Sequence, residues 1–104
     1  VLRNALQGTV IHDPNPVEPA DRRFKMKAWL MRRGFYLFTS PDGVHWKRNE
    51  SVALPFDPDA SCEIFWDDQA GVYRTYLRST RHIESPRTVR RIVYGKTPDV
   101  LRPW

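Results

Sequence analysis

The stretch Ser40-Pro41-Asp42-Gly43-Val44-His45-Trp46 ends the first half of this chain. A variant of it, Thr97-Pro98-Asp99-Val100-Leu101-Arg102-Pro103-Trp104, ends the second half. The hydroxyl residues lie 57 positions apart (97 − 40) and the tryptophans 58 positions apart (104 − 46). A period of about 50 residues, made of short aromatic strands between turns, is typical of β-propeller blades. We therefore predict two blade-like repeats within residues 1–104, one at about 5–50 and one at about 58–104.

The rest of the chain predicts an all-β fold of two four-stranded antiparallel meanders, which together make an incomplete propeller. Aromatic and β-branched runs between turn residues predict strands, and nine prolines argue against helices. The expected strands are 7–12, 23–31, 34–40 and 44–48, then 60–66, 71–78, 88–95 and a short C-terminal strand. Residues 49–59 lack alternation and are expected to link the repeats, and residues 79–86 are expected to form a polar loop.

Composition narrows the classes of function. No apolar run approaches 18 residues, so the sequence predicts no membrane span. The single cysteine, Cys62, excludes an internal disulfide and a cysteine zinc cluster. The spacing of His12, His45 and His82 fits no metal motif, and there is no glycine-rich phosphate loop. We therefore expect neither a metal site nor a cofactor.

The net charge of +5 is compatible with binding to nucleic acid. Most arginines are spread along the chain, and the main cluster is the segment Arg87-Thr88-Val89-Arg90-Arg91. Scattered positive charge is typical of a solvated surface. A basic nucleic-acid-binding domain is therefore the weakest of the hypotheses that the sequence supports.

Two acidic residues are the candidates for catalysis. Asp59 lies at the start of the expected strand 60–66, and propellers place ligand-binding groups where inner strands meet the central channel. Glu63 follows four residues later, an even spacing that puts both side chains on one face of a strand. Paired carboxylates serve glycoside hydrolysis, one as acid or base and the other as nucleophile or charge stabiliser. The alternative is that both are hydrogen-bonded structural acids.

Two further residues are candidates for substrate binding. Arg78 ends the expected strand 71–78, where a guanidinium can hold a carboxylate or a sugar hydroxyl, or can pair with Asp59 instead. Asn4 stands before the first inner strand, where the second repeat has Asp59. A neutral amide there cannot supply a second catalytic carboxylate.

Four segments resemble successive blades of one family. They are Val10-Ile11-His12-Asp13-Pro14 with Arg22-Arg23-Phe24-Lys25-Met26, the hairpin 34–46, the segment 59–78, and the segment 90–104. Together they are similar to about two blades of the five-bladed propeller proteins related to glycoside hydrolases of the invertase and arabinanase type. The resemblance implies a carbohydrate ligand and hydrolysis by carboxylates on inner strands. Only Asp59 matches such a position, so we expect the isolated chain to be inactive as a hydrolase.

A second hypothesis is a non-catalytic interaction module. Two meanders that do not close a ring leave unpaired strand edges, and such edges pair readily with another copy of the same chain. We therefore expect a homo-oligomer that forms through open sheet edges.

Overall fold

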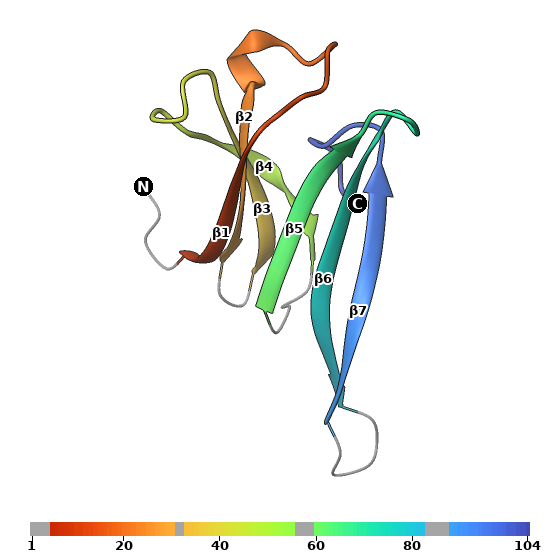
Figure 1. Cartoon of the computed structure of the whole chain (residues 1–104). Helices are drawn as coiled ribbons and strands as arrows, with labels where there is room; N and C mark the ends of the chain where they lie inside the picture. Colours follow the sequence, from red (N-terminus) through yellow and green to blue (C-terminus); the bar gives the residue numbers. More distant parts are fainter. Residues whose placement is uncertain (1–4, 31–32, 56–59, 83–87) are drawn as a thin grey trace.

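The computed structural model describes residues 5–30, 33–55, 60–82 and 88–104 of the 104-residue chain. In chain order the elements are β1 (Ala5–His12), the short 3-10 helix η1 (Ala20–Arg22), β2 (Phe24–Leu30), β3 (Gly34–Ser40), β4 (Lys47–Leu54), β5 (Ala60–Asp67), β6 (Val72–His82) and β7 (Thr88–Thr97). They form a four-stranded sheet, β1-β2-β3-β4, and a three-stranded sheet, β5-β6-β7 (Figure 1). All paired strands are antiparallel. The predicted all-β class and the two consecutive meanders are confirmed.

The fourth strand of the first sheet is longer than the sequence predicted. We expected a strand over 44–48 and a link from 49 onward, whereas β4 runs from Lys47 to Leu54. Its pairing with β3 shifts register twice, between Phe35 and Tyr36 and again between Tyr36 and Phe38. Each bulge places extra residues of β4 opposite one residue of β3 and so breaks the alternation of side chains. The missing alternation therefore marked an irregular strand and not a link.

The second sheet differs from its expectation in two places. In its described part it has three strands, because the C-terminal residues form a turn in place of the fourth strand. The amide of Trp104 donates to the carbonyl of Ala53 in β4 at 3.0 Å, so this end of the chain binds the first sheet. Strand β6 also extends to His82, where a polar loop was expected, because its backbone keeps pairing with β7 as far as Thr88.

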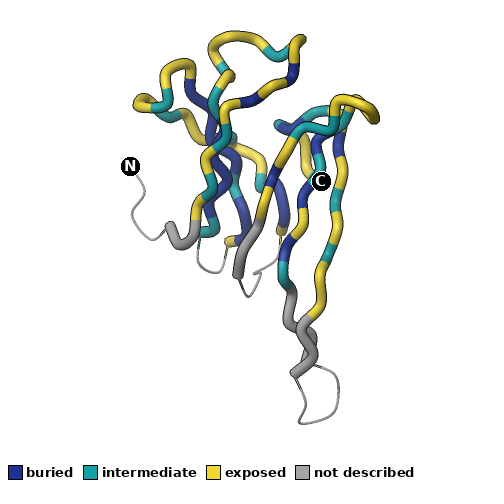
Figure 2. Tube along the Cα trace, viewed as in Figure 1, coloured by how far each residue is buried: buried dark blue, intermediate teal, exposed yellow. Residues whose placement is uncertain are grey.

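The two sheets pack against each other face to face, and β1 contacts β5. One buried cluster joins Phe35 and Leu54 of the first sheet to Leu77 of the second. A second cluster joins Leu37 to residues of the second sheet and of the C-terminal turn, namely Ile64, Tyr73 and Val100. Figure 2 shows buried stretches along β2, β3 and β6, whereas β7 is mostly exposed in its described part. Burial of these apolar groups holds the two meanders together.

The first hairpins of the two sheets share one aromatic contact. His12 of β1 and Phe24 of β2 pack edge to face with ring centroids 5.0 Å apart. Trp66 of β5 and Tyr73 of β6 pack in the same way at 4.9 Å. Both pairs are direct cross-strand partners in the first hairpin of their sheet. The same edge-to-face contact therefore stands at the same place in both hairpins.

The two Ser/Thr-Pro-Asp turns also correspond. The Ser40 hydroxyl accepts hydrogen bonds from the amides of Asp42 and Gly43, and the Thr97 hydroxyl accepts one from the amide of Asp99. The indole of Trp46 donates to the carbonyl of Gly43 at 3.1 Å and packs over Met26, Ala28 and Phe38. The residues of this motif therefore hold the turn together and cover part of the first sheet.

Candidate functional site

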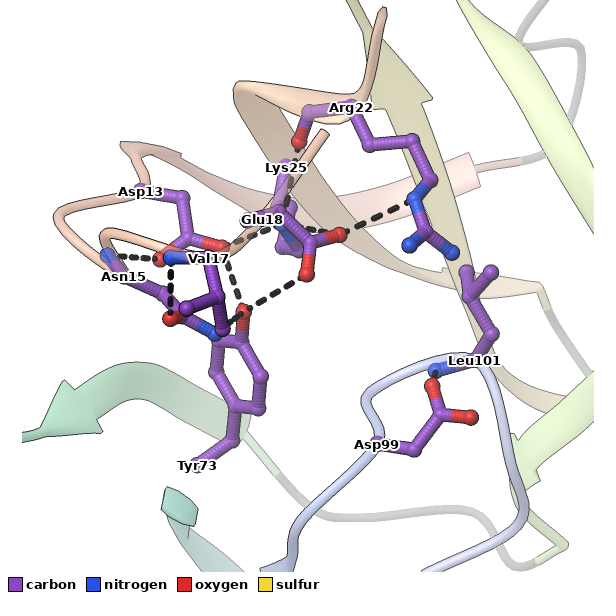
Figure 3. Close-up of polar contacts among 9 residues, drawn as sticks. All are labelled: Asp13, Asn15, Val17, Glu18, Arg22, Lys25, Tyr73, Asp99 and Leu101. Atoms are coloured by element: carbon purple, nitrogen blue, oxygen red, sulfur yellow. Dashed lines mark hydrogen bonds and ion pairs between the residues drawn. The ribbon is translucent and has the colours of Figure 1, made fainter. Parts of the chain in front are cut away.

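Among the described residues, a dense network of hydrogen bonds and ion pairs lies at the end of β1, where the loop through η1 folds back over β2 (Figure 3). At its centre the side chain of Lys25 is fully buried. Its ammonium binds the Asp13 carboxylate, the Glu18 carboxylate at 3.1 Å and the carbonyl of Arg22 at 2.9 Å. Hydrogen bonds to Asp13 and to the Arg22 carbonyl, together with the ion pair to Glu18, compensate the buried ammonium group.

Tyr73 brings the second sheet into this cluster. Its hydroxyl donates to Asp13 Oδ2 at 2.6 Å and accepts from the Asn15 side chain at 3.0 Å. The Asp13 carboxylate also accepts the Asn15 backbone amide at 2.9 Å. We call Asp13, Asn15, Glu18, Lys25 and Tyr73 the lysine cluster. It joins the long first loop, β2 and β6 through side chains that are up to 60 residues apart.

The charges of the lysine cluster balance. Arg22 pairs with Glu18 at 3.0 Å, so two carboxylates face one ammonium and one guanidinium. The side chain of Asp13 is fully buried, and that of Glu18 is 11% exposed. A substrate therefore has no open approach to either acid. The arrangement is that of a structural polar network that holds the loop and the two sheets together, and not that of a reaction centre.

The second sheet contains a counterpart of the central ion pair. Asp67 ends β5 as Asp13 follows β1, and it pairs with Arg74, the third residue of β6. Hydrogen bonds from the Ala70 amide, and then the nearby Arg74 charge, hold the pKa of Asp67 below its usual value, against the opposing effect of desolvation. In this pair the Arg74 side chain is 31% exposed and the Asp67 side chain 19% exposed, whereas the Asp13–Lys25 pair is covered.

The predicted site residues do not form a common site within the described structure. Asp59 and Asn4 lie outside the described residues. Glu63 and Arg78 lie on the same face of the second sheet, because Glu63 pairs with Tyr76 and Arg78 follows Tyr76 by two residues. Glu63 is exposed. Its backbone carbonyl accepts hydrogen bonds from Thr75 at 2.7 Å and from Lys27 at 3.2 Å.

A separate groove of about 620 Å³ lies in the first repeat. It runs between η1, the turn from Ser40 to Trp46, and β4. The lining residues include the Trp46 indole, basic groups and several polar groups: Asp21, Lys47, Arg48, Asn49, Glu50 and Ser51. The groove therefore combines one aromatic residue with many hydrogen-bond donors and acceptors.

Sequence reasoning missed the lysine cluster, although a signal was present. An acid follows the first strand of each repeat, and a base stands near the start of the next strand in both. In the first repeat these residues are Asp13 and Lys25, and in the second they are Asp67 and Arg74. Comparing the repeats position by position finds both pairs. Comparing the repeats could not identify Tyr73 as a partner of Asp13, because this hydrogen bond joins one sheet to the other.

Comparison with protein-family models, with curated proteins and with solved structures found no match for this chain. In the described residues no helix has the length and hydropathy needed to cross a bilayer. No three histidine, cysteine or acidic side chains of the described part gather as metal ligands would.

We predict that Tyr73→Phe destabilises the fold by about 2 kcal/mol, because it removes the hydroxyl that donates to the buried Asp13 carboxylate. Urea denaturation measures this loss. Tyr94→Phe is the matched control, since Tyr94 is exposed on the outer face, and it should change stability by no more than about 0.5 kcal/mol. Equal effects of the two substitutions would contradict the structural role of Tyr73.

The same hydroxyl gives a pH dependence. Burial, and then the hydrogen bond to Asp13, raise the pKa of Tyr73 above its ordinary value of about 10. The folded protein therefore keeps this proton where the unfolded chain releases it. Its contribution to stability is complete below about pH 10 and declines as the pH rises further. Tyr73→Phe should flatten the alkaline decline in unfolding free energy.

Proposed function

We propose that this chain is a carbohydrate-binding, two-sheet unit of a glycosidase-like β-propeller and that it has no hydrolase activity of its own. The observation that supports the propeller architecture best is the stacking of two meanders with duplicated contacts. The first strands of the two sheets are neighbours, and the edge-to-face rings, the acid–base pairs and the Asp turns all recur. Successive propeller blades are related in this way.

The described acids support the absence of hydrolysis. Catalytic carboxylates of glycosidases lie about 5 to 10 Å apart and flank an open sugar site. Asp13 and Glu18 bind the same ammonium, but they are covered and charge-compensated. Glu63 and Asp67 share a strand face, but four residues along a strand separate them by about 13 Å. Neither pair meets both requirements.

The groove beside Trp46 is the proposed carbohydrate site. Sugars present hydroxyl groups that donate and accept hydrogen bonds, together with apolar C–H faces. Lys47 and Arg48 supply donors, Glu50 supplies an acceptor, and the indole supplies an apolar surface. The exposed residue Ser51 lies within the groove, so a bulky side chain there would fill it.

The expected result is saturable binding of an oligosaccharide from a panel of plant and microbial glycans, without release of reducing sugar. Calorimetric titration measures binding, and a reducing-end assay measures turnover. Ser51→Trp should abolish binding, whereas Gln69→Trp, in an exposed turn outside the groove, should leave it unchanged. Binding that survives Ser51→Trp would contradict the proposed site. Turnover that Asp59→Asn abolishes would overturn the absence of hydrolysis.

A further inference from the structure

The second sheet has an outer face that the first sheet does not cover. Phe65, Tyr76, Ile92 and Tyr94 are 41%, 43%, 79% and 43% exposed, respectively. Their neighbours in sequence or register, including Ile64 and Leu77, point the other way and are buried against the first sheet. Phe65 and Tyr76 stack at 6.1 Å, and Tyr76 and Tyr94 lie 5.3 Å apart. We call these four residues the outer aromatic face. A contiguous exposed apolar surface of this kind marks an interaction site.

The outer aromatic face occupies the positions that the first sheet buries. The cross-strand pairs Lys25–Ile11 and Lys27–Leu37 of the first sheet correspond to Arg74–Phe65 and Tyr76–Tyr94 of the second. Ile11 and Leu37 pack in the cluster between the sheets. Phe65 and Tyr94, at the equivalent positions of the second sheet, have no sheet over them in the described structure.

The two acid–base pairs show the same difference. The Asp13–Lys25 pair lies under the second sheet and receives the Tyr73 hydroxyl from it. The corresponding Asp67–Arg74 pair is partly exposed, and the Arg74 guanidinium lies 5.8 Å from the Tyr94 ring centroid. Three of the four corresponding positions of the outer face therefore keep the apolar or charged character of a face that this chain already buries, and Tyr76 replaces Lys27 at the fourth.

We propose that the outer aromatic face binds a second copy of this chain through the first sheet of that copy. Within the chain, Ile11 and Leu37 of the first sheet pack against the inner face of the second sheet. That inner face contains Ile64, Tyr73 and Leu77. Val10, Phe24 and Ala28 are the corresponding residues of the first sheet, on its face away from the second sheet, where Trp46 packs over the buried Ala28. Val10 is 53% exposed there. The contact between copies then repeats the contact within the chain.

This association is head to tail, because it joins two different faces. Such an interface leaves one free face of each kind at the ends of the assembly, so it continues until it closes into a ring or extends as a filament. It uses sheet faces, whereas the sequence pointed to sheet edges. The inference does not depend on a carbohydrate ligand, so failure of the groove experiment would leave it unaffected.

The test is sedimentation velocity of the full chain across a concentration series, with one disabling charge on each face. Wild type should shift to larger species as its concentration rises. Ile92→Glu on the outer aromatic face and Val10→Glu on the first sheet should each remain monomeric. Val17→Glu is the control, since Val17 is 83% exposed in the first loop, and it should associate as wild type does.

Mixing the two disabled variants identifies the geometry. Each retains one intact face, so an equimolar mixture of Ile92→Glu and Val10→Glu should form a heterodimer and stop there. Circular dichroism of each variant confirms that it is folded. A wild type that stays monomeric at the highest concentration would overturn the proposal. Association of Val10→Glu with itself as strongly as wild type would also overturn it, because that outcome indicates a back-to-back dimer.

Discussion

Lys25→Met should destabilise the fold by about 3–5 kcal/mol, the largest effect expected of any single substitution in the lysine cluster. The methionine has a similar volume, so the substitution removes the charge with little change in packing. It leaves Asp13 buried without the ammonium that compensates its charge, and it also removes a partner of Glu18. Urea denaturation followed by tryptophan fluorescence measures the change in unfolding free energy.

Two comparisons isolate this charge. Lys47→Met changes the same residue type at an exposed position of β4 and should alter stability by no more than about 0.5 kcal/mol. Adding Asp13→Asn to Lys25→Met should recover part of the loss, because the uncompensated carboxylate is then neutral. A loss below about 1 kcal/mol for Lys25→Met, or a double variant less stable by the sum of both losses, would refute the charge argument.

Gly34→Ala should be the second most damaging substitution, with an expected loss of about 3 kcal/mol. Gly34 has φ of +93°, a conformation that L side chains rarely adopt. A Cβ there would lie 2.3 Å from the carbonyl oxygen of Leu54 and 3.2 Å from Val52 Cγ2. Because that carbonyl belongs to the backbone of β4, the clash cannot be relieved without moving the strand beside β3. Thermal and urea unfolding both measure the loss.

Gly71→Ala separates backbone strain from crowding. Gly71 has φ of +63°, but a Cβ there would meet no atom within 4 Å. Its expected cost is the left-handed conformation alone, about 1 kcal/mol. If Gly34→Ala cost no more than Gly71→Ala, the close approach of β3 and β4 at Gly34 would be contradicted.

Local features were the part of the fold that the sequence predicted best. The turn at Ser40 has its donors, acceptors and positive-φ glycine within a few residues, so the motif contains the information for its own hydrogen bonds. Strand β3 was predicted over its observed range of 34–40, because its apolar residues are continuous and a glycine and a proline bound it. Strand β4 was not, because bulges in its pairing with β3 remove the alternation by which strands are recognised.

The candidate site was harder to predict because its contacts are between distant segments. Asp13 and Tyr73 are 60 residues apart, and only the packing of one sheet on the other brings them together. Buried lysines are also rare, so a lysine within a strand does not by itself predict a buried ion pair. In the structure Glu63 and Arg78 lie on one sheet face, which is the outer face of the second sheet. The sequence could not say which face each sheet would turn toward the other.

The ion pairs Asp13–Lys25 and Asp67–Arg74 stand at corresponding places in the two sheets but in different dielectric environments. Salt ions reach the exposed Asp67–Arg74 pair and screen its attraction, but they cannot enter the covered space around Asp13 and Lys25. Ionic strength therefore weakens one pair and spares the other. The type of basic residue is consistent with this difference. At the covered position the compact ammonium of Lys25 contacts two carboxylates. At the exposed position the planar guanidinium of Arg74 pairs with Asp67 and also lies over the Tyr94 ring.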